Sequence, residues 1–277
     1  MLGALIIVFR EVIEAGLIVG IALAVTRGIA GRGRFLGMGI AAGVLGACLV
    51  GAFISTISNA FEGLGQELFN AGILALAVVM LTWHNVWMAR HGRELATEMR
   101  KAGEAVRAGT STLLRFAVVV AVAVLREGSE IALFLYGVLV ASGPGSGMSV
   151  FVGGLIGLVL GAGVTALAYL GLIQIPTRYI FAVTSVLIAL LAAGLAAQSV
   201  AFLEQADVIT ALPGRLWDSS YILSDTSLLG RVLHTLIGYS DHPSAMEGLI
   251  YLMTLAVIAL LMKLFAHSKT PTRTARA

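Results

Sequence analysis

Residues 2–26 read LGALIIVFREVIEAGLIVGIALAVT, an apolar stretch interrupted by three charged residues. A helix needs about 20 mainly apolar residues to cross the hydrocarbon core of a membrane, because it rises about 1.5 Å per residue. The whole chain of 277 residues is 58% hydrophobic and 12% charged, which is far from the composition of a soluble domain. We therefore expect residues 2–26 to form a membrane-spanning helix.

Six further stretches have the length and apolar character of a membrane span. They are Phe35–Ser58, Leu68–Ala89, Phe116–Ala141, Met148–Ile173, Tyr179–Leu203 and Ala245–Phe265. Together with the first stretch they predict an all-α membrane protein with seven transmembrane helices. The one cysteine, Cys48, lies inside a span, so an internal disulfide and a site with several thiolate ligands are both excluded.

The basic residues between the spans indicate the orientation of the helices. Most of the 18 lysines and arginines fall on one side of the predicted membrane, in the connections at 27–34 and 90–115, at Arg178 and in the C-terminal tail. Because basic loops stay in the cytoplasm, we expect the N-terminus outside and the C-terminus in the cytoplasm. The net charge of +3 then reflects membrane orientation, and no nucleic-acid partner is expected.

The first and fourth spans contain the same charged pattern. Residues 10–14 read Arg-Glu-Val-Ile-Glu and residues 126–130 read Arg-Glu-Gly-Ser-Glu, so both copies are Arg-Glu-x-x-Glu. Three spans separate one copy from the next, and an odd number of spans reverses the direction of the chain. The pattern predicts an inverted-topology 3+3 repeat with a seventh helix appended.

The chain divides into five predicted parts. The residues at 91–115 mix basic and acidic side chains at helical spacing, which favours a charged cytoplasmic helix. The residues at 204–244 carry more acidic than basic side chains. The parts are a first three-helix repeat at 1–90, a charged cytoplasmic connection at 91–115, a second three-helix repeat at 116–203, an external acidic loop at 204–244, and a seventh helix with a basic cytoplasmic tail at 245–277.

Both motifs fall near the middle of the membrane. Counted at about 1.5 Å per residue, they lie roughly 12–21 Å from the start of their spans. A charge at that depth costs about 2.5–3.5 kcal/mol, so we expect the motif side chains to face the bundle interior or a wet cavity. Residues three and four apart share a helix face, so Glu11 lies near Glu14, and Glu127 lies near Glu130.

The motifs carry two more negative charges than positive ones. A divalent cation would neutralise these two excess negative charges. The motifs offer oxygen donors and contain no cysteine, histidine or methionine, which suits iron, manganese, magnesium or calcium better than copper(I). A proton relay without metal and a purely structural network of ion pairs are the alternatives. The predicted metal ligands are Glu11, Glu14, Glu127 and Glu130, and the supporting residues are Arg10 and Arg126.

Three other residues are candidates for the path of the ion. Glu67 and Asp218 lie in acidic external loops, and such loops would concentrate cations at the outer mouth. His84, near the predicted inner end of the third span, would help the ion to leave. A lone histidine at a helix end is more often a hydrogen-bonded interface residue, so this role and the structural one both stay open.

The paired motifs resemble those of the oxidase-linked high-affinity iron permeases, and the EfeU-type bacterial iron transporters most closely. Residues 66–69, 81–83, 217–220 and 238–239 are similar to that family in order and spacing, so the resemblance covers nearly the whole chain. It implies iron uptake into the cytoplasm, with the four motif glutamates as the translocation site and no cofactor. The family pattern Arg-Glu-Gly-Leu-Glu is altered here at the middle positions, whereas the charged positions are intact.

The resemblance also implies partners: the iron ion, the lipid bilayer, and an extracytoplasmic protein that binds or oxidises iron. It leaves the choice between Fe²⁺ and Fe³⁺ open. The alternative function is a proton-coupled transporter of another divalent cation or of a small solute. An enzyme is not expected, because the chain lacks a His-Glu-x-x-His motif and its Gly145-Ser146-Gly147 falls in a short turn.

Overall fold

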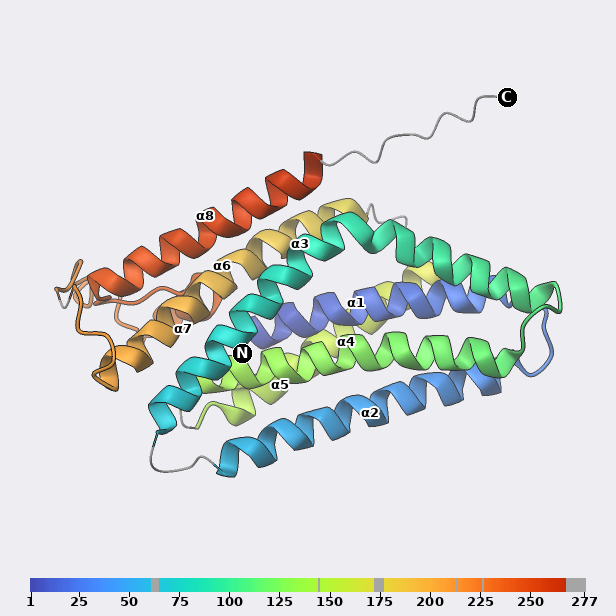
Figure 1. The fold of residues 1–277 in the computed structure, drawn as a ribbon, viewed down its shortest axis with the longest axis horizontal. Helices are drawn as coiled ribbons and strands as arrows, with labels where there is room; N and C mark the ends of the chain where they lie inside the picture. The colour runs from blue at the N-terminus through green and yellow to red at the C-terminus, as the bar shows by residue number, and fades with distance from the viewer. Residues whose placement is uncertain (61–64, 144, 172–176, 213, 226, 268–277) are drawn as a thin grey trace.

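The computed structural model describes residues 1–60, 65–143, 145–171, 177–212, 214–225 and 227–267. Within these residues the protein is a bundle of long helices without β-strands, and Arg215 and Ser244 form one isolated bridge. The helices are α1 (Leu2–Val25), α2 (Arg32–Ala60), α3 (Gln66–Arg107), α4 (Leu113–Ser142), α5 (Gly147–Tyr169), α6 (Thr177–Gln205), α7 (Leu228–Ile237) and α8 (Ala245–His267) (Figure 1).

Five of the predicted spans lie within one long helix each, the span predicted at 2–26 ends one residue after α1, and the span predicted at 148–173 begins in α5, which ends at Tyr169. The all-α prediction is therefore confirmed for the described residues. Five helices, α2, α3, α5, α6 and α8, contain a stretch that is long and apolar enough to cross a membrane. Helices α1 and α4 have 24 and 30 residues, but each carries three charged residues in its motif. The predicted tail after His267 and the acidic residue Glu62 lie outside the described residues.

Two features differ from the expected layout. Helix α3 does not end near Ala89 but continues as one helix of 42 residues to Arg107, so the predicted charged connection is its second half. One face of that half is apolar and docks on the bundle, where Met99 is buried beside Ile18 and Phe116. The short helix α7 lies in the predicted external loop, between an N-cap at Ser227 and a left-handed Gly238.

The connections alternate between the two ends of the bundle. The α1–α2 and α3–α4 connections lie together at one end, and α7 and the start of α8 lie at the other (Figure 1). At the first end the guanidinium of Arg107 donates a hydrogen bond to the carbonyl of Arg27 at 3.2 Å. The two basic connections of the first half therefore share one end.

Helix α2 packs closely along α4, because glycines remove side chains from the contact. A Cβ atom at Gly39 would lie 2.5 Å from the carbonyl oxygen of Ala117, and one at Gly43 would lie 2.7 Å from that of Ala121. Such distances leave no room for a side chain. The outer face of α2 exposes Leu49 and other large apolar residues, which suits contact with lipid.

Helix α5 packs along α1 in the same manner. A Cβ atom at Gly157 would lie 2.5 Å from the carbonyl oxygen of Leu5, and Gly153 faces the carbonyl of Met1. Helices α3 and α6 cover the opposite side of α1 and α4, where Ile7, Leu74 and Ile188 share one buried apolar cluster. The motif helices α1 and α4 are thus enclosed between two pairs of helices.

Candidate metal site

Each motif forms an ion pair within its own helix. The Arg10 guanidinium donates to a carboxylate oxygen of Glu14 at 2.9 Å, and the Arg126 guanidinium donates to Glu130 at 3.2 Å. These partners are four residues apart, so the helix itself brings them onto one face. Arg126 also lies 3.9 Å from a carboxylate oxygen of Glu127, a longer contact than the one to Glu130. The arginines therefore compensate mainly Glu14 and Glu130.

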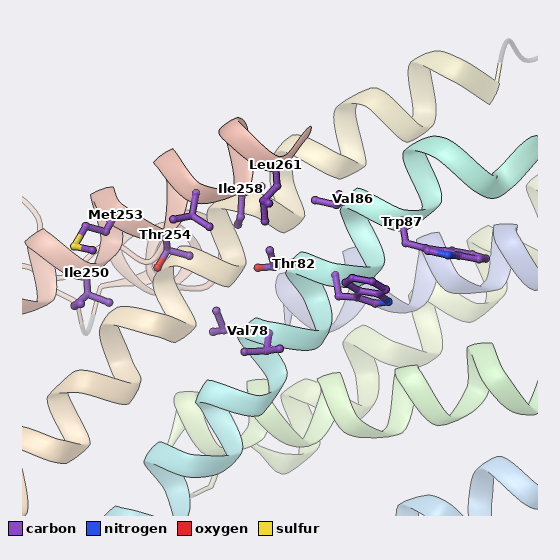
Figure 2. A pocket seen from close by; sticks show the side chains of 12 residues that line it. Val78, Thr82, Val86, Trp87, Ile250, Met253, Thr254, Ile258 and Leu261 are labelled. Carbon is purple, nitrogen blue, oxygen red and sulfur yellow. The ribbon is translucent and has the colours of Figure 1, made fainter. Parts of the chain in front are cut away.

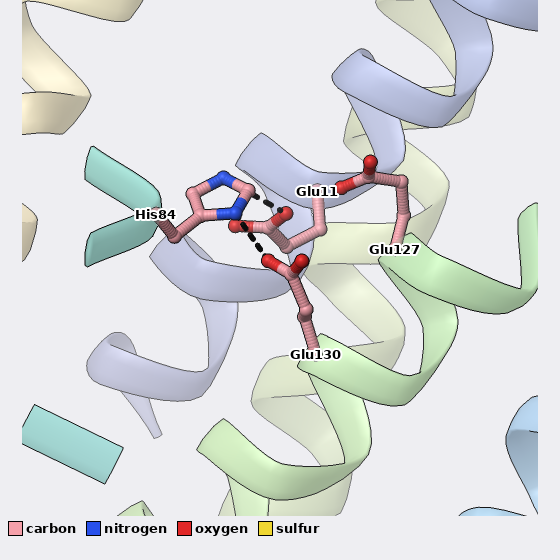
Figure 3. Close-up of side chains that lie close together, drawn as sticks. All are labelled: Glu11, His84, Glu127 and Glu130. Atoms are coloured by element: carbon pink, nitrogen blue, oxygen red, sulfur yellow. Dashed lines mark ion pairs between the residues drawn. The ribbon is translucent and has the colours of Figure 1, made fainter. Parts of the chain in front are cut away.

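A cluster of four side chains from three helices lies between the two motifs. It consists of Glu11 from α1, His84 from α3, and Glu127 and Glu130 from α4 (Figure 3). Each residue offers one oxygen or nitrogen atom, and these atoms all lie within 4.8 Å of one another. Ligands on opposite sides of a divalent transition-metal ion lie about 4.2 Å apart at bond lengths of about 2.1 Å, so the group is close to the size of a metal site.

His84 reaches this cluster from one side and comes from the middle of α3 rather than from the end of a helix (Figure 3). Its Nδ1 atom contacts a carboxylate oxygen of Glu130, and its Nε2 atom lies 3.4 Å from Glu14 and 3.6 Å from Glu11. From the sequence, His84 was expected near the inner end of the third span, because the apolar stretch stops at Ala89. Since α3 continues to Arg107, residue 84 lies near the middle of the helix instead.

The carboxylates and the imidazole of the site are almost completely buried. Glu11, Glu14, Glu127 and His84 are exposed by 3% or less, and Glu130 by 8%. Among the described residues, several of their buried atoms have no hydrogen-bond partner: both oxygens of Glu11, one oxygen each of Glu14, Glu127 and Glu130, and both ring nitrogens of His84. Unpaired buried polar atoms are costly, so this set of donors calls for a bound cation or protons.

Two neighbours of His84 on α3 support the arginines. The Asn85 side chain accepts a hydrogen bond from Arg10 at 3.5 Å and donates one to the backbone carbonyl of Ser185 on α6 at 3.1 Å. The Trp87 ring lies under the Arg126 guanidinium at 4.3 Å from its centroid. Sequence reasoning missed both residues, although a polar pair between two tryptophans inside an apolar stretch was a signal for them.

The structure contains a crevice that reaches the candidate metal site and a cavity at one end of the bundle. A mostly apolar crevice of about 870 Å³ between α1, α2, α4 and α5 reaches Glu11 and Glu127. A more polar cavity of about 900 Å³ lies at the end of the bundle where α3 begins, and Glu67 and Tyr136 are in its wall. Glu67 therefore lies in the wall of a cavity, and its role at an outer mouth stays a prediction.

Asp218 lies elsewhere, exposed on the segment at 204–244, and its carboxylate accepts hydrogen bonds from the backbone and side chain of Ser220. A third space, of about 560 Å³, separates α3 from α8 and is lined by Trp83, Met253 and other apolar side chains (Figure 2). None of the motif glutamates lines that space. It suits lipid rather than an ion.

Comparison with known proteins identifies relatives over nearly the full length. Residues 1–273 match the model of the iron permease FTR1 family. The chain is 32% identical over 264 residues to a ferrous iron permease EfeU of Escherichia coli O6:H1, with 93% of this chain and 94% of that protein covered. It is 30% identical to a ferrous iron permease EfeU of Yersinia pestis, with 90% and 89% covered. No solved structure matches the chain.

These findings decide the broad class of the protein. Its relatives are permeases, so the chain is a transporter and not an enzyme, as the sequence predicted. The apolar helices and the permease relatives make it a multi-pass protein of the inner membrane. With a family match that extends over 1–273, the chain belongs to the iron permease FTR1 family.

Proposed function

We propose that the protein carries Fe²⁺ across the membrane into the cell, and that the ion passes through a site formed by Glu11, Glu14, Glu127 and Glu130. The observation that carries this proposal is the set of buried carboxylate oxygens without hydrogen-bond partners between α1 and α4. Oxygen donors of this kind bind divalent cations. The names of the EfeU relatives, which are called ferrous iron permeases, support the choice of iron.

Charge favours the ferrous ion. Four ionised glutamates and two arginines leave two negative charges in a site that is closed to bulk water. Metal binding requires ionised carboxylates, and Fe²⁺ would then bring the net charge to zero. Fe³⁺ would leave one positive charge buried in the membrane, at a cost of several kcal/mol.

We propose that α1 and α4 also span the membrane, so that seven spans form an inverted 3+3 repeat with α8 appended. The glycine contacts support this arrangement, because α2 meets Ala117 and Ala121 of α4 whereas α5 meets Met1 and Leu5 of α1. The contacted residues of the two motif helices are 116 positions apart, the same offset as between the two motifs. The two halves thus exchange equivalent contacts, as an inverted repeat requires.

The outer cavity near Glu67 is the proposed mouth, and Arg10 and Arg126 hold the glutamates that line the passage. The predicted extracytoplasmic iron-binding or iron-oxidising protein would contact the external segment at 204–244. That segment carries Trp217, Tyr221 and Ile222 as exposed side chains, which are typical of residues at protein contacts. Exposed acidic groups such as Asp218 would attract the cation to this side of the membrane.

Uptake of radioactive iron into proteoliposomes tests the proposal. Wild type, Glu11→Gln and Glu127→Gln would be compared with and without a reductant, and Glu98→Gln, an exposed glutamate on the second half of α3, would serve as the control. We expect uptake under reducing conditions by wild type and the control, and none by the two site variants. Equal uptake by all four proteins would contradict the site, and proton-driven uptake of another solute by wild type without iron uptake would support the alternative function.

A further inference from the structure

We propose that His84 is a ligand of the transported ion, and that its nitrogen restricts the site to transition-metal ions such as Fe²⁺ against Ca²⁺ and Mg²⁺. This inference rests on the proposed function, because it concerns the same site. The two Arg-Glu-x-x-Glu motifs contain only oxygen donors and would suit alkaline-earth ions equally well. Among the described residues of the cluster, His84 on α3 is therefore the one nitrogen donor, and it can discriminate between these classes of ion.

The imidazole ring of His84 lies where a ligand of the ion would lie. It enters from α3 into the space between α1 and α4, and its two nitrogens face carboxylates of both motif helices (Figure 3). The ligand atoms of Glu11, Glu127 and Glu130 and one nitrogen of His84 lie within 4.8 Å of one another. An ion between these carboxylates would therefore lie within bonding reach of the ring after shifts of a few tenths of an ångström.

Burial leaves the ring few other roles. His84 is 3% exposed, and neither of its nitrogens makes a hydrogen bond with good geometry to a described residue. A histidine that only packed between helices would donate to a backbone carbonyl or to a hydroxyl group. Here both nitrogens are directed at carboxylate oxygens that accept no hydrogen bond from a described residue. One nitrogen can then bind the ion while the other faces a carboxylate, which is how histidine ligands of metal ions are commonly held.

The helix that carries His84 is held in place from both sides. Asn85 joins α3 to the Ser185 carbonyl of α6 and to Arg10, and Trp87 packs on Arg126. These contacts fix the depth at which the ring enters the site. A ligand on a rigid element keeps its geometry, so the ion is selected by the donor set rather than by the flexibility of a loop.

A neutral imidazole also preserves the charge balance. It contributes a nitrogen without adding a charge, so two arginines and four glutamates still leave a site for a divalent ion. Imidazole binds iron, zinc, copper and nickel well, whereas Ca²⁺ and Mg²⁺ prefer oxygen alone. Sites for iron in helical bundles combine carboxylates with histidines on facing helices in the same way.

Two measurements on the purified protein test this assignment. The first is pulsed electron paramagnetic resonance of bound Mn²⁺, which detects a coordinated imidazole nitrogen, in wild type, His84→Gln and His242→Gln. His242 is an exposed histidine near Asp225 and Asp241 on the external segment and provides the matched control. We expect the nitrogen signal in wild type and in His242→Gln and its loss in His84→Gln. A signal that persists in His84→Gln would overturn the assignment.

The second measurement is iron uptake in the presence of Ca²⁺ as competitor. The variant His84→Asp has only oxygen donors at the site. We expect Ca²⁺ to inhibit iron uptake by this variant at concentrations at least about tenfold lower than those that inhibit wild type. The reason is that loss of even a residue that only supports a metal ligand changes metal affinity by about 10- to 100-fold. Unchanged competition in a folded His84→Asp protein would refute the inference while leaving iron transport intact. Absence of iron uptake by wild type would instead refute the proposed function itself.

Discussion

The two glutamates of each motif have different surroundings. Glu14 is bound to Arg10, and Glu130 is bound to Arg126, so each of these pairs is internally compensated. Glu11 and Glu127 face each other's helix and carry oxygens without partners. In each motif, the second glutamate thus gives one oxygen to an arginine and keeps the other without a hydrogen-bond partner, as the first glutamate does.

This difference predicts opposite effects on stability. Glu14→Gln leaves the buried Arg10 guanidinium without its carboxylate, which costs about 3–5 kcal/mol when a buried pair is broken. Glu11→Gln removes a buried negative charge that accepts no hydrogen bond from a described residue, so the protein without metal should be no less stable than wild type. Thermal unfolding of the purified proteins in the presence of a chelator measures the difference. A lower Tm for Glu11→Gln than for Glu14→Gln would contradict it.

Within the segment at 204–244, Asp225 and Asp241 join two parts of the chain through reciprocal hydrogen bonds, an arrangement called the clamp below. The backbone N–H of Asp225 donates to the Asp241 carboxylate at 3.1 Å, and the N–H of Asp241 donates to the Asp225 carboxylate at 3.1 Å. The hydrogen bond from the Asp225 backbone lowers the pKa of Asp241. Trp217 lies beside this clamp, since its indole N–H donates to the Ser240 carbonyl at 3.3 Å.

A pH dependence follows for the clamp. Because the folded pKa of Asp241 lies below its ordinary value of about 4, its contribution to stability is present above that value and is lost as the pH falls through the folded pKa. Trp217 fluorescence, recorded after Trp83 and Trp87 are replaced by phenylalanine, should change on acidification. The change should be absent in Asp241→Asn and retained in Asp218→Asn, and a response that is the same in both variants would argue against the clamp.

At the scale of elements, the close contact of α1 with α5 depends on glycine. A Cβ atom at Gly157 would lie 2.5 Å from the Leu5 carbonyl oxygen, whereas one at Gly163 in the same helix has no neighbour within 4 Å. Gly157→Ala should therefore separate the helices and destabilise the protein by about 1–3 kcal/mol, as overpacking does. Gly163→Ala should be neutral or stabilising by about 0.4–1 kcal/mol. Thermal unfolding compares the two, and equal Tm values would contradict the contact.

Much of this architecture was predictable from the sequence, because lipid imposes a length and an apolar composition on every span. The motifs at residues 10–14 and 126–130 were equally predictable, since charged residues are rare inside apolar stretches of this length. The position of His84 was not, because α3 continues through charged residues by docking Met99 on the bundle, and only tertiary contacts show this. Helix α7 is short and depends on its caps rather than on a long apolar stretch.

At the scale of the whole molecule, the orientation in the membrane is open to direct measurement. With Cys48 replaced by alanine, single cysteines would be placed at Ser220 in the segment at 204–244 and at Thr110 between α3 and α4, both exposed positions. The positive-inside rule predicts that a membrane-impermeant maleimide labels Ser220→Cys in intact cells and labels Thr110→Cys only after the membrane is opened. The reverse labelling pattern would invert the proposed direction of the bundle.

The central claim is that one ion binds between the two motif helices. An anomalous X-ray difference map at the iron absorption edge, from crystals grown with Fe²⁺, locates that ion directly. The account predicts a single strong peak bounded by Glu11, Glu127 and Glu130, with His84 as its nitrogen neighbour. A map with iron only at Asp225, Asp241 and His242, and no peak between α1 and α4, would contradict it.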